Sequence, residues 1–503
     1  MNFTPLARPY FTAIHRSLTK EKMHPDTSQE HLLKRLLHDA ARTETGRRYG
    51  FGSISSYGEY VARVPVRPYE EIRPEVMRMV AGEADVLWPG VTRRFAQSSG
   101  TSDGRSKFIP VTSDSLRRCH YRGAAAVVAE YLHLNPRSRL FSGKSFILGG
   151  SFATSLQDLP DGVKVGDLSA HLIDRISPLA NLMRTPSKQV ALMPDWTDKL
   201  PRLVEESLRS DVISLSGVPS WFLTVLRDVI ATAGADTIHD VWPHLEVFFH
   251  GGISFEPYRE QYRSITDPAK MKYMETYNAS EGFFAVQDEP DSTRAMLLLT
   301  DCGIFYEFQP VDAPDAPPVT CRDVEPGRVY ALIISSCNGL WRYPIGDTVR
   351  VESVCPLRIT IAGRTKSFIN AFGEELMVHN ADAAIAATCR ELGCAVADYT
   401  AAPVFADCRT KGHHQWLVEF SCPPESTETF ATILDRHLCD ENSDYAAKRA
   451  GDIFLAPLEL RAVPAGTFTA YLASTGKLGG QRKMPRLSND RHIMDAVLKI
   501  LGA

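Results

Sequence analysis

Residues 97–110 read Gln97-Ser-Ser-Gly-Thr-Ser-Asp-Gly-Arg-Ser-Lys-Phe-Ile-Pro110, and this stretch says most about the fold and the chemistry of the chain. Gly100 and Gly104 stand among hydroxyl residues, with Lys107 near the end. Glycines let successive backbone N–H groups converge on an anion, while hydroxyls and a lysine add donors and charge. The spacing does not fit Gly-x4-Gly-Lys-Ser/Thr, so the segment predicts a phosphate loop that differs from the P-loop. The alternative is a solvated Ser/Gly loop.

Three later segments favour a nucleotide site. His250-Gly251-Gly252 follows a strand-like run, and paired glycines let a backbone approach a flat ligand closely. In Tyr277-Asn-Ala-Ser-Glu281, a ring can stack on a base while the carboxylate holds Mg²⁺. In Trp341-Arg-Tyr-Pro-Ile-Gly-Asp347, the aspartate can accept both hydroxyls of a ribose. The plainer alternatives are a strand-end turn with a surface glutamate and an aspartate bonded to its own turn.

Composition and charge exclude several classes of protein. The chain has 503 residues, which suggests about three domains or one large domain plus a small one. Hydrophobic residues make up 44% and charged residues 23%, so the chain can bury a sizeable core. Its net charge of −4 excludes a polyelectrolyte-type binder of nucleic acid, and no nucleic-acid partner is expected. One small phosphate ligand needs only a local site.

Cysteine usage and hydropathy predict a soluble cytoplasmic protein. The 10 cysteines form no Cys-x-x-Cys pair and are typical of reduced core residues. There is no His-Glu-x-x-His, so a metal cluster is not expected. The N-terminus lacks the apolar run of a signal peptide, and no stretch of 18 apolar residues occurs, so no membrane contact is expected.

Helical and strand-like patterns alternate, which predicts an α/β fold. Helices are expected at 31–42 and 115–133. The first would bury one face made of Leu32, Leu33, Leu36, Leu37 and Ala40, and the second would bury Ala124, Val127, Val128 and Tyr131. Short apolar runs that end at Gly, Asn or Pro predict strands at 145–148, 245–249, 295–300, 330–335 and 358–362.

The pattern changes after residue 362, and residues 363–503 predict a separate small α+β domain. Helices are expected at 380–393, 426–440 and 488–501, with a strand-like run at 452–463. Ser488 is the expected N-cap of the last helix, with Asp490 in its first turn.

Taken in order, these motifs resemble the adenylate-forming enzyme superfamily. The order is a Ser-Ser-Gly-Thr loop, Tyr-x-x-Ser-Glu, Tyr-x-x-Gly-Asp, Gly-Arg and a C-terminal lysine. Within it, the chain is similar to the acyl acid amido synthetases, the auxin-conjugating family of plants and its bacterial relatives. The strings that carry this likeness are Val64-Pro-Val-Arg-Pro-Tyr-Glu-Glu-Ile-Arg-Pro74, Ser98-Ser-Gly-Thr-Ser102, Ser216-Gly-Val-Pro-Ser-Trp-Phe222, Gly303-Ile-Phe-Tyr-Glu-Phe308 and Gln481-Arg-Lys-Met-Pro-Arg486.

The resemblance implies a fold and a reaction. Residues 1–362 would form a large adenylation domain and 363–503 a small mobile lid, with the active site between them. A carboxylic acid would attack the α-phosphorus of ATP, giving an acyl-adenylate and pyrophosphate. An amine, usually of an amino acid, would then attack the acyl carbon and release AMP. The first step needs no general base because the carboxylate is already an anion; it needs positioning and charge stabilisation.

The resemblance also assigns roles to residues. Glu281 would contact Mg²⁺ and the phosphates, and Tyr277 would lie on the adenine, walled by residues 250–252. Asp347 would hold the ribose, with Arg364 as a second contact at the hinge. The predicted ATP-binding residues are Ser98, Ser99, Gly100, Thr101, Gly251, Gly252, Tyr277, Asn278, Ser280, Asp347 and Arg364.

A lysine of the lid would bridge the carboxylate and the α-phosphate. The family's Gln-x-Lys-x-Pro-Arg string favours Lys483, whereas the superfamily's Gly-Lys pairing favours Lys477; we favour Lys483. The hinge is expected near 363–373, where glycines flank a strand. The chain departs from the plant pattern at residues 378–382, Val-His-Asn-Ala-Asp, where plant members carry a short Asp-Lys string, so the amine pocket is expected to differ.

The acyl pocket carries no motif. Tyr121 and Arg122, on the helix after the phosphate loop, are candidates to contact the acid; the alternative is that both are surface groups of an amphipathic helix. Trp221 and Phe222 are candidates for an apolar wall, or for ordinary core. Two other functions stay open: an adenylate-forming ligase that transfers the acyl group to a thiol such as coenzyme A, and a nucleotide-binding sensor without catalysis.

Overall fold

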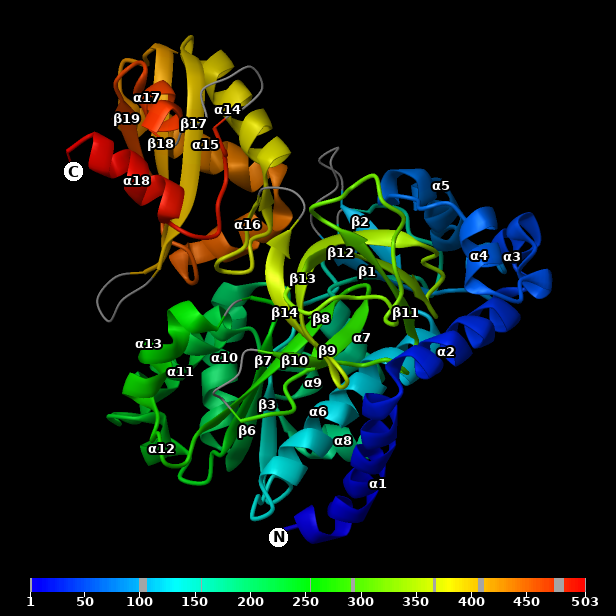
Figure 1. Cartoon of the computed structure of the whole chain (residues 1–503). Helices are drawn as coiled ribbons and strands as arrows, with labels where there is room; N and C mark the ends of the chain where they lie inside the picture. The colour runs from blue at the N-terminus through cyan, green and yellow to red at the C-terminus, as the bar shows by residue number, and fades with distance from the viewer. Residues whose placement is uncertain are drawn as a thin grey trace.

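The computed structural model describes residues 2–98, 106–154, 156–253, 255–290, 295–364, 368–405, 411–474 and 484–502. A large N-terminal body built around a twisted sheet carries a smaller C-terminal domain at one end (Figure 1). This arrangement confirms the predicted α/β class with a large domain and a small one.

The central sheet of the large domain contains eleven strands among the described residues. One half of it is parallel, as expected where helices connect successive strands. These strands are, in spatial order, β5 (Arg184–Thr185), β3 (Lys144–Ile147), β6 (Val212–Gly217), β7 (Val247–Gly251) and β8 (Lys272–Ala279).

The other half of the sheet is antiparallel and starts with the β8–β9 hairpin. Its strands are β9 (Gly282–Val286), β10 (Met296–Leu298), β14 (Leu357–Arg364), β13 (Tyr343–Val354), β12 (Val329–Ser336) and β11 (Ile304–Pro310). The apolar runs predicted as strands at 245–249, 295–300, 330–335 and 358–362 overlap β7, β10, β12 and β14, and 145–148 overlaps β3.

A second sheet of the large domain carries the predicted phosphate loop. It consists of β2 (Lys107–Pro110), β1 (Arg94–Ser98) and β4 (Lys164–Gly166). The helices around both sheets are α1 (Thr4–Met23), α2 (Pro25–Ala40), α3 (Glu44–Tyr49), α4 (Tyr57–Arg63), α5 (Tyr69–Val80), α6 (Tyr121–Leu134), α7 (Leu168–Arg175), α8 (Pro178–Leu182), α9 (Lys188–Ala191), α10 (Trp196–Leu208), α11 (Pro219–Ala233), α12 (Ile238–Val241) and α13 (Arg259–Ile265).

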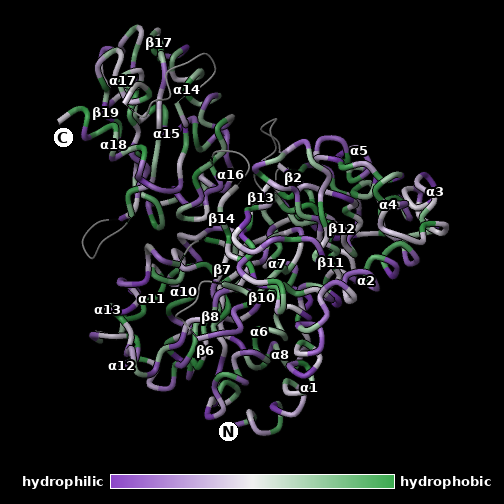
Figure 2. Tube along the Cα trace, viewed as in Figure 1, coloured by the Kyte–Doolittle hydropathy of each residue, from purple (hydrophilic) through white to green (hydrophobic). Residues whose placement is uncertain are grey.

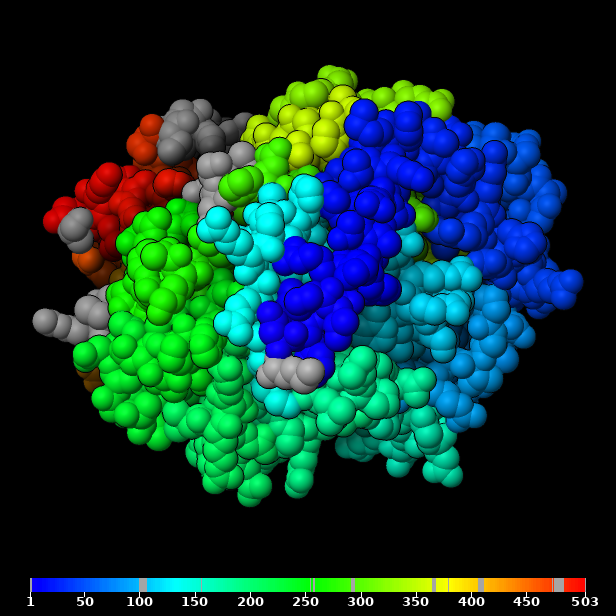
Figure 3. All heavy atoms as spheres, turned by 90° about the horizontal axis from the view of Figure 1, so that it is seen from below, coloured from blue at the N-terminus to red at the C-terminus, as the bar shows by residue number. Residues whose placement is uncertain are grey.

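The first predicted helix is confirmed, and so is its buried face. Every residue of the predicted apolar stripe of α2 is at most 5% exposed. The N-terminal helix α1 lies across the outer surface beside α6 (Figure 3), where Phe11 and Ile14 pack against the core. Hydrophobic residues gather on the central strands, while outer helices such as α1 carry many hydrophilic ones (Figure 2).

The second predicted helix is confirmed, and so is its buried face except at Ala124: Val127 and Tyr131 are buried, and Val128 packs against the core. It begins with a π-helical turn (Ser115–His120) and continues as α6. Ala124 is exposed, whereas Gly123 is buried. Gly123 packs so closely against the Phe283 ring that a Cβ at this position would lie 2.3 Å from it. Glu130 is 1% exposed, since Lys22 of α1 pairs with it at 3.1 Å. Hydrophobic periodicity alone does not predict a buried glutamate whose charge is balanced by a lysine of another helix.

The C-terminal domain packs helices against a sheet of three described strands. The strands are β17 (Ala395–Val404), β18 (His413–Cys422) and β19 (Glu459–Val463), and the helices are α14 (Val378–Leu392), α15 (Thr427–Glu441), α16 (Ser443–Arg449), α17 (Thr467–Ser474) and α18 (His492–Ile500). A short ladder of β15 (Phe368–Ile369) and β16 (Leu376–Met377) precedes α14.

Two details of the C-terminal prediction are wrong. Only Glu459–Val463 of the run 452–463 forms a strand. The last helix starts at His492, so its N-cap is Arg491 rather than Ser488, and Asp490 lies before the helix. The reason is a tertiary contact: the Ser488 amide donates to the Ala401 carbonyl at 3.1 Å and so extends the segment along β17.

Candidate active site

The predicted phosphate loop connects two strands of a β-hairpin. Ser98, at the end of β1, pairs with Lys107, at the start of β2, so both ends of the loop are fixed. The Gln97 side-chain amide donates to Ser106 Oγ at 3.3 Å across the same end of the hairpin. Ser99, Gly100 and Thr101 lie outside the described residues.

Helix α5 and strand β13 hold the base of this hairpin. The Phe108 amide donates to Tyr69 Oη at 2.6 Å, and the Arg73 guanidinium donates to the Ser106 carbonyl at 2.9 Å. Lys107 Nζ donates to Tyr343 Oη at 2.9 Å, next to the Gly346–Asp347 segment. Residues of the string at 64–74 therefore hold the base of the hairpin, and Lys107 links the hairpin to the predicted ribose site.

Glu281 lies in the two-residue turn of the β8–β9 hairpin, between the paired Ala279 and Gly282. Its backbone carbonyl accepts from Asn338 Nδ2 at 3.1 Å, and the residue is 9% exposed. Burial raises the pKa of Tyr69 to about 12, and the negative charge of Glu281 adds to that rise. Ser280 shares this turn.

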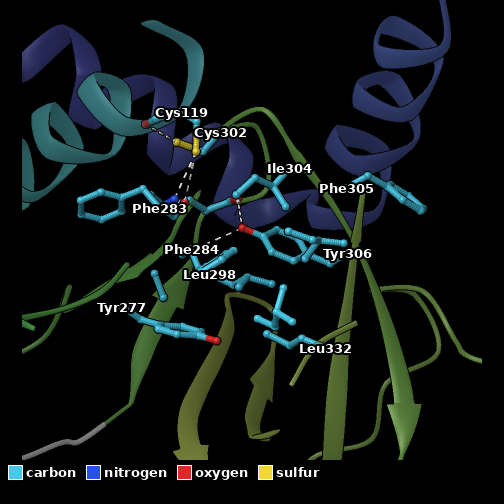
Figure 4. Packing of buried hydrophobic residues seen from close by; sticks show 14 of the residues in the cluster. Cys119, Tyr277, Phe283, Phe284, Leu298, Cys302, Ile304, Phe305, Tyr306 and Leu332 are labelled. Carbon is cyan, nitrogen blue, oxygen red and sulfur yellow. Dashed lines mark hydrogen bonds between the residues drawn. The ribbon is translucent and has the colours of Figure 1, made fainter. Parts of the chain in front are cut away.

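Tyr277 and Asp347 come together from β8 and β13. The Tyr277 hydroxyl donates to Asp347 Oδ2 at 2.6 Å, and the two residues are 5% and 9% exposed. The Tyr277 ring packs 4.7 Å from the Phe284 ring at the edge of the core (Figure 4). What the structure shows is therefore a tyrosine that orders the carboxylate; the stacking of adenine on its ring stays a prediction.

The two glycines that follow His250 lie where β7 ends beside β8. A Cβ at Gly251 would lie 2.4 Å from the Thr276 carbonyl and 3.0 Å from Asn278 Oδ1, so only glycine fits. Gly252 has φ of +85°, which also favours glycine. Burial lowers the pKa of His250 to about 3, so its ring, stacked 4.2 Å from Phe255, is neutral. The structure therefore shows a backbone packed closely against β8 at Gly251, while its approach to a flat ligand stays a prediction.

Arg364 lies beside Asp347 in the sheet. Asp347 pairs with Arg364, and Thr348 with Gly363, at the end of the β13–β14 ladder. The backbone therefore places both predicted ribose contacts at one end of the β13–β14 ladder, and these two strands reach toward the C-terminal domain in Figure 1.

The structure favours the surface alternative for Arg122. Its guanidinium pairs with Glu21 at 2.7 Å and Asp301 at 3.1 Å, and its side chain is 38% exposed. The Tyr121 hydroxyl donates to the Leu172 carbonyl at 3.0 Å. The polar groups of both residues are therefore engaged within the protein. Arg122 pairs with two carboxylates of the chain itself, and Tyr121 could contact an acid only through its ring.

Sequence reasoning missed the contacts between the two domains. The Ser220 hydroxyl and the Trp221 indole donate to the Phe372 carbonyl at 3.1 and 3.3 Å, and the Tyr258 hydroxyl donates to the Ala371 carbonyl at 2.5 Å. Lys448 Nζ lies 3.8 Å from the centre of the Trp221 ring. The string at 216–222 was the available signal, but its partners are more than 100 residues away. Trp221 thus forms an interdomain contact rather than a substrate wall, while Phe222 is core.

Lys477 and Lys483 both lie outside the described residues. No group of three or more His, Cys, Asp or Glu side chains within the described ranges could hold a metal ion. A single carboxylate such as that of Glu281 is sufficient for Mg²⁺, because this ion prefers one or two carboxylates together with phosphate oxygens and water. Among the helices that are described, none has the length and apolar character needed to cross a membrane.

The structure defines an α/β protein with a large N-terminal and a small C-terminal domain, and comparison identifies the family. Models described as the GH3 family N-terminal, central and C-terminal domains match residues 14–271, 297–364 and 379–492. The chain belongs to the GH3 family.

The curated proteins that resemble this chain carry GH3 names as well. A probable indole-3-acetic acid-amido synthetase, GH3.1, of Arabidopsis thaliana is 24% identical over 93% of this chain and 90% of its own. The indole-3-acetic acid-amido synthetase GH3.8 of Oryza sativa subsp. indica is 25% identical over 92% and 88%.

Solved structures share the fold over nearly the whole chain. The AtGH3.15 acyl acid amido synthetase in complex with 2,4-DB has a TM-score of 0.62 at 19% identity, covering 96% of this chain and 95% of its own. A 2-hydroxyisobutyryl-CoA ligase with 2-HIB-AMP and CoA, in the thioesterification state, has a TM-score of 0.56 at 13% identity, covering 95% and 92%. Amide-forming and thioester-forming enzymes therefore share this architecture.

Proposed function

We propose that the protein is an ATP-dependent acyl acid amido synthetase. It adenylates a carboxylic acid, releasing pyrophosphate, and then transfers the acyl group to an amine, that of an amino acid. The observation that carries the proposal is a set of contacts around the start of β13: Lys107 of the phosphate-loop hairpin bonds to Tyr343, Asn338 bonds to the Glu281 carbonyl, and Tyr277 bonds to Asp347. These contacts occur in a chain of the GH3 family. The relatives named as amido synthetases favour an amine over a thiol as the acceptor.

The proposed roles follow from position and charge. The loop after Ser98, together with Lys107, binds the ATP phosphates through backbone N–H groups, hydroxyls and one ammonium. Asp347, ordered by Tyr277, accepts the ribose hydroxyls, with Arg364 beside it. Residues 250–252 and Asn278 border the base.

Mg²⁺, held by Glu281 and phosphate oxygens, would supply positive charge at the phosphates. The chain's own contribution to the first step is to bring two anions together and to stabilise the charge that develops at phosphorus. We further propose that residues 363–503 turn as a lid about residues 363–373, and that this turn brings Lys483 to the reacting carboxylate. The cytoplasm remains the expected location, on composition and cysteine usage alone.

The experiment that tests this function is ATP–pyrophosphate exchange with Mg²⁺ across a panel of aromatic and aliphatic carboxylic acids. We expect exchange that depends on the acid, and amide formation when an amino acid is then supplied. Product formation with coenzyme A instead would support the thioester ligase, and ATP binding without exchange for any acid would support the sensor.

Weakening the ribose site should raise the KM for ATP. Asp347→Ala removes a charged hydrogen-bond acceptor and is expected to raise that KM by about 10–100-fold, whereas Tyr277→Phe, which only loosens Asp347, should raise it a few-fold. Tyr445→Phe is the matched control, because the Tyr445 hydroxyl also donates to a carboxylate, that of Asp435, at 2.6 Å, but in the C-terminal domain. Equal effects of the two tyrosine variants would contradict the assignment.

A further inference from the structure

The segment that follows residues 475–483 is fixed along the edge of β17. The Thr400 hydroxyl donates to the Pro485 carbonyl at 2.8 Å, the Ala401 amide to the Arg486 carbonyl at 2.8 Å, and the Ser488 amide to the Ala401 carbonyl at 3.1 Å. Leu487 forms a parallel bridge with Ala401. These bonds make residues 485–488 a short parallel addition to the sheet of the C-terminal domain.

The side chain of Arg486 adds a second anchor, which we call the Arg486 clasp: Arg486, Asp382, Asp398 and Tyr399. The guanidinium bonds to the Asp382 carboxylate, lies 3.8 Å from Asp398 Oδ1, and covers the Tyr399 ring at 5.2 Å from its centre. The Tyr399 hydroxyl donates to Asp382 Oδ1 at 2.7 Å. A planar guanidinium that is bonded at its edge and stacked on its face has little conformational freedom. The ammonium group of a lysine in the same place would not be held in this way.

The clasp contributes little to stability. The side chains of Arg486, Asp382 and Asp398 are 35%, 40% and 31% exposed, and exposed ion pairs contribute only about 0–1 kcal/mol. Met484, by contrast, is 3% exposed and packs in the small core of this domain. Together, the clasp and the packing of Met484 fix the position of the chain immediately after residue 483.

The orientation of β17 gives this anchor a direction. Phe405, just after β17, packs 6.0 Å from Tyr258 of the large domain, so this end of the strand faces that domain. Tyr399 is six residues earlier, roughly 20 Å further away along the strand. Because residues 485–488 run parallel to β17, their N-terminal end points away from the large domain (Figure 1). In this arrangement the domain must turn for the chain at residue 484 to face Asp347 and Glu281.

We propose that Arg486 is a positioning residue for adenylation, which it serves by fixing the point from which Lys483 leaves the lid. This inference rests on the proposed function. Lys483 directly precedes the anchored Met484, whereas Lys477 is nine positions from Arg486. When the lid turns as a body, the anchored Met484 turns with it. We therefore expect the clasp to matter for a function of Lys483 rather than of Lys477.

A double-mutant cycle on ATP–pyrophosphate exchange tests the inference. Arg486→Ala should lower the exchange rate at saturating ATP by roughly 10–100-fold, because a small misplacement of a reacting group is costly, with the KM for ATP changed less than threefold. Arg486→Lys should restore only part of the rate. In a Lys483→Ala background, Arg486→Ala should cause no further loss, because the group it positions is gone.

Arg436→Ala is the matched control, since Arg436 pairs with Glu391 at 2.5 Å on the surface of the same domain. Asp382→Asn, which keeps the size of the side chain, is the second variant, and circular dichroism checks that each variant is folded. The inference is overturned if Arg486→Ala is as harmless as Arg436→Ala, or if it costs the same factor with and without Lys483. Absence of exchange by the wild-type protein would overturn the proposed function, and this inference with it.

Discussion

Replacing Lys483 with alanine is expected to lower the acid-dependent ATP–pyrophosphate exchange rate by roughly 100–1,000-fold, the usual loss when one preorganised donor to a developing charge is removed. The affinity for ATP should be almost unchanged, because the proposed nucleotide contacts lie in the large domain or, for Arg364, at the hinge. Exchange kinetics report the first quantity, and equilibrium binding of ATP reports the second.

Lys477→Ala is the matched variant, since this lysine lies six positions earlier in the same stretch. We expect it to keep the wild-type rate within a few-fold. If Lys483→Ala exchanges at the wild-type rate while Lys477→Ala does not, the bridging role belongs to Lys477 and the positioning role of Arg486 falls as well.

Replacing Glu307 with glutamine is expected to lower the free energy of unfolding by about 3–5 kcal/mol, because it leaves the Arg342 guanidinium buried without its counter-charge. The two side chains are 0% and 5% exposed and contact at 2.8 Å. Arg342 also donates to the Val64 carbonyl, and Glu307 accepts from the Tyr57 hydroxyl. The pair thus ties α4 and the segment after it to β11 and to the turn before β13. Urea unfolding of the full chain, followed by tryptophan fluorescence, measures the change.

The exposed pair of Arg209 and Glu205, which contact at 2.7 Å on α10, provides the control. Glu205→Gln should change the unfolding free energy by less than about 1 kcal/mol. Replacing both Glu307 and Arg342 with apolar residues of similar volume should recover much of the loss, since neither charge is then left alone. A Glu307→Gln variant as stable as Glu205→Gln would show that the buried pair does not hold these elements together.

Sequence patterns predicted the features that depend on local spacing. The apolar stripe of α2 and the strands of the central sheet both follow from periodicity and turn residues. The motif order also brought Glu281, Tyr277 and Asp347 into one prediction, and the structure joins the last two directly at 2.6 Å.

What the sequence could not predict depends on contacts between distant segments. Ser488 reads as a helix cap, but its amide is taken by Ala401 of β17. Arg122 reads as a ligand for an acid, but Glu21 and Asp301, from two other parts of the chain, already pair with it. Glu130 is buried because Lys22 neutralises it. In each case a tertiary partner overrides a sound local preference.

The most direct test of the account is the fate of the oxygen atoms of the acid. In the proposed reaction a carboxylate oxygen attacks the α-phosphorus and remains on AMP when the amine displaces it. An acid labelled with ¹⁸O in both carboxylate oxygens should therefore give AMP that carries one ¹⁸O and an amide that keeps the other, as read by mass spectrometry. Unlabelled AMP, or label in inorganic phosphate instead, would contradict an acyl-adenylate route.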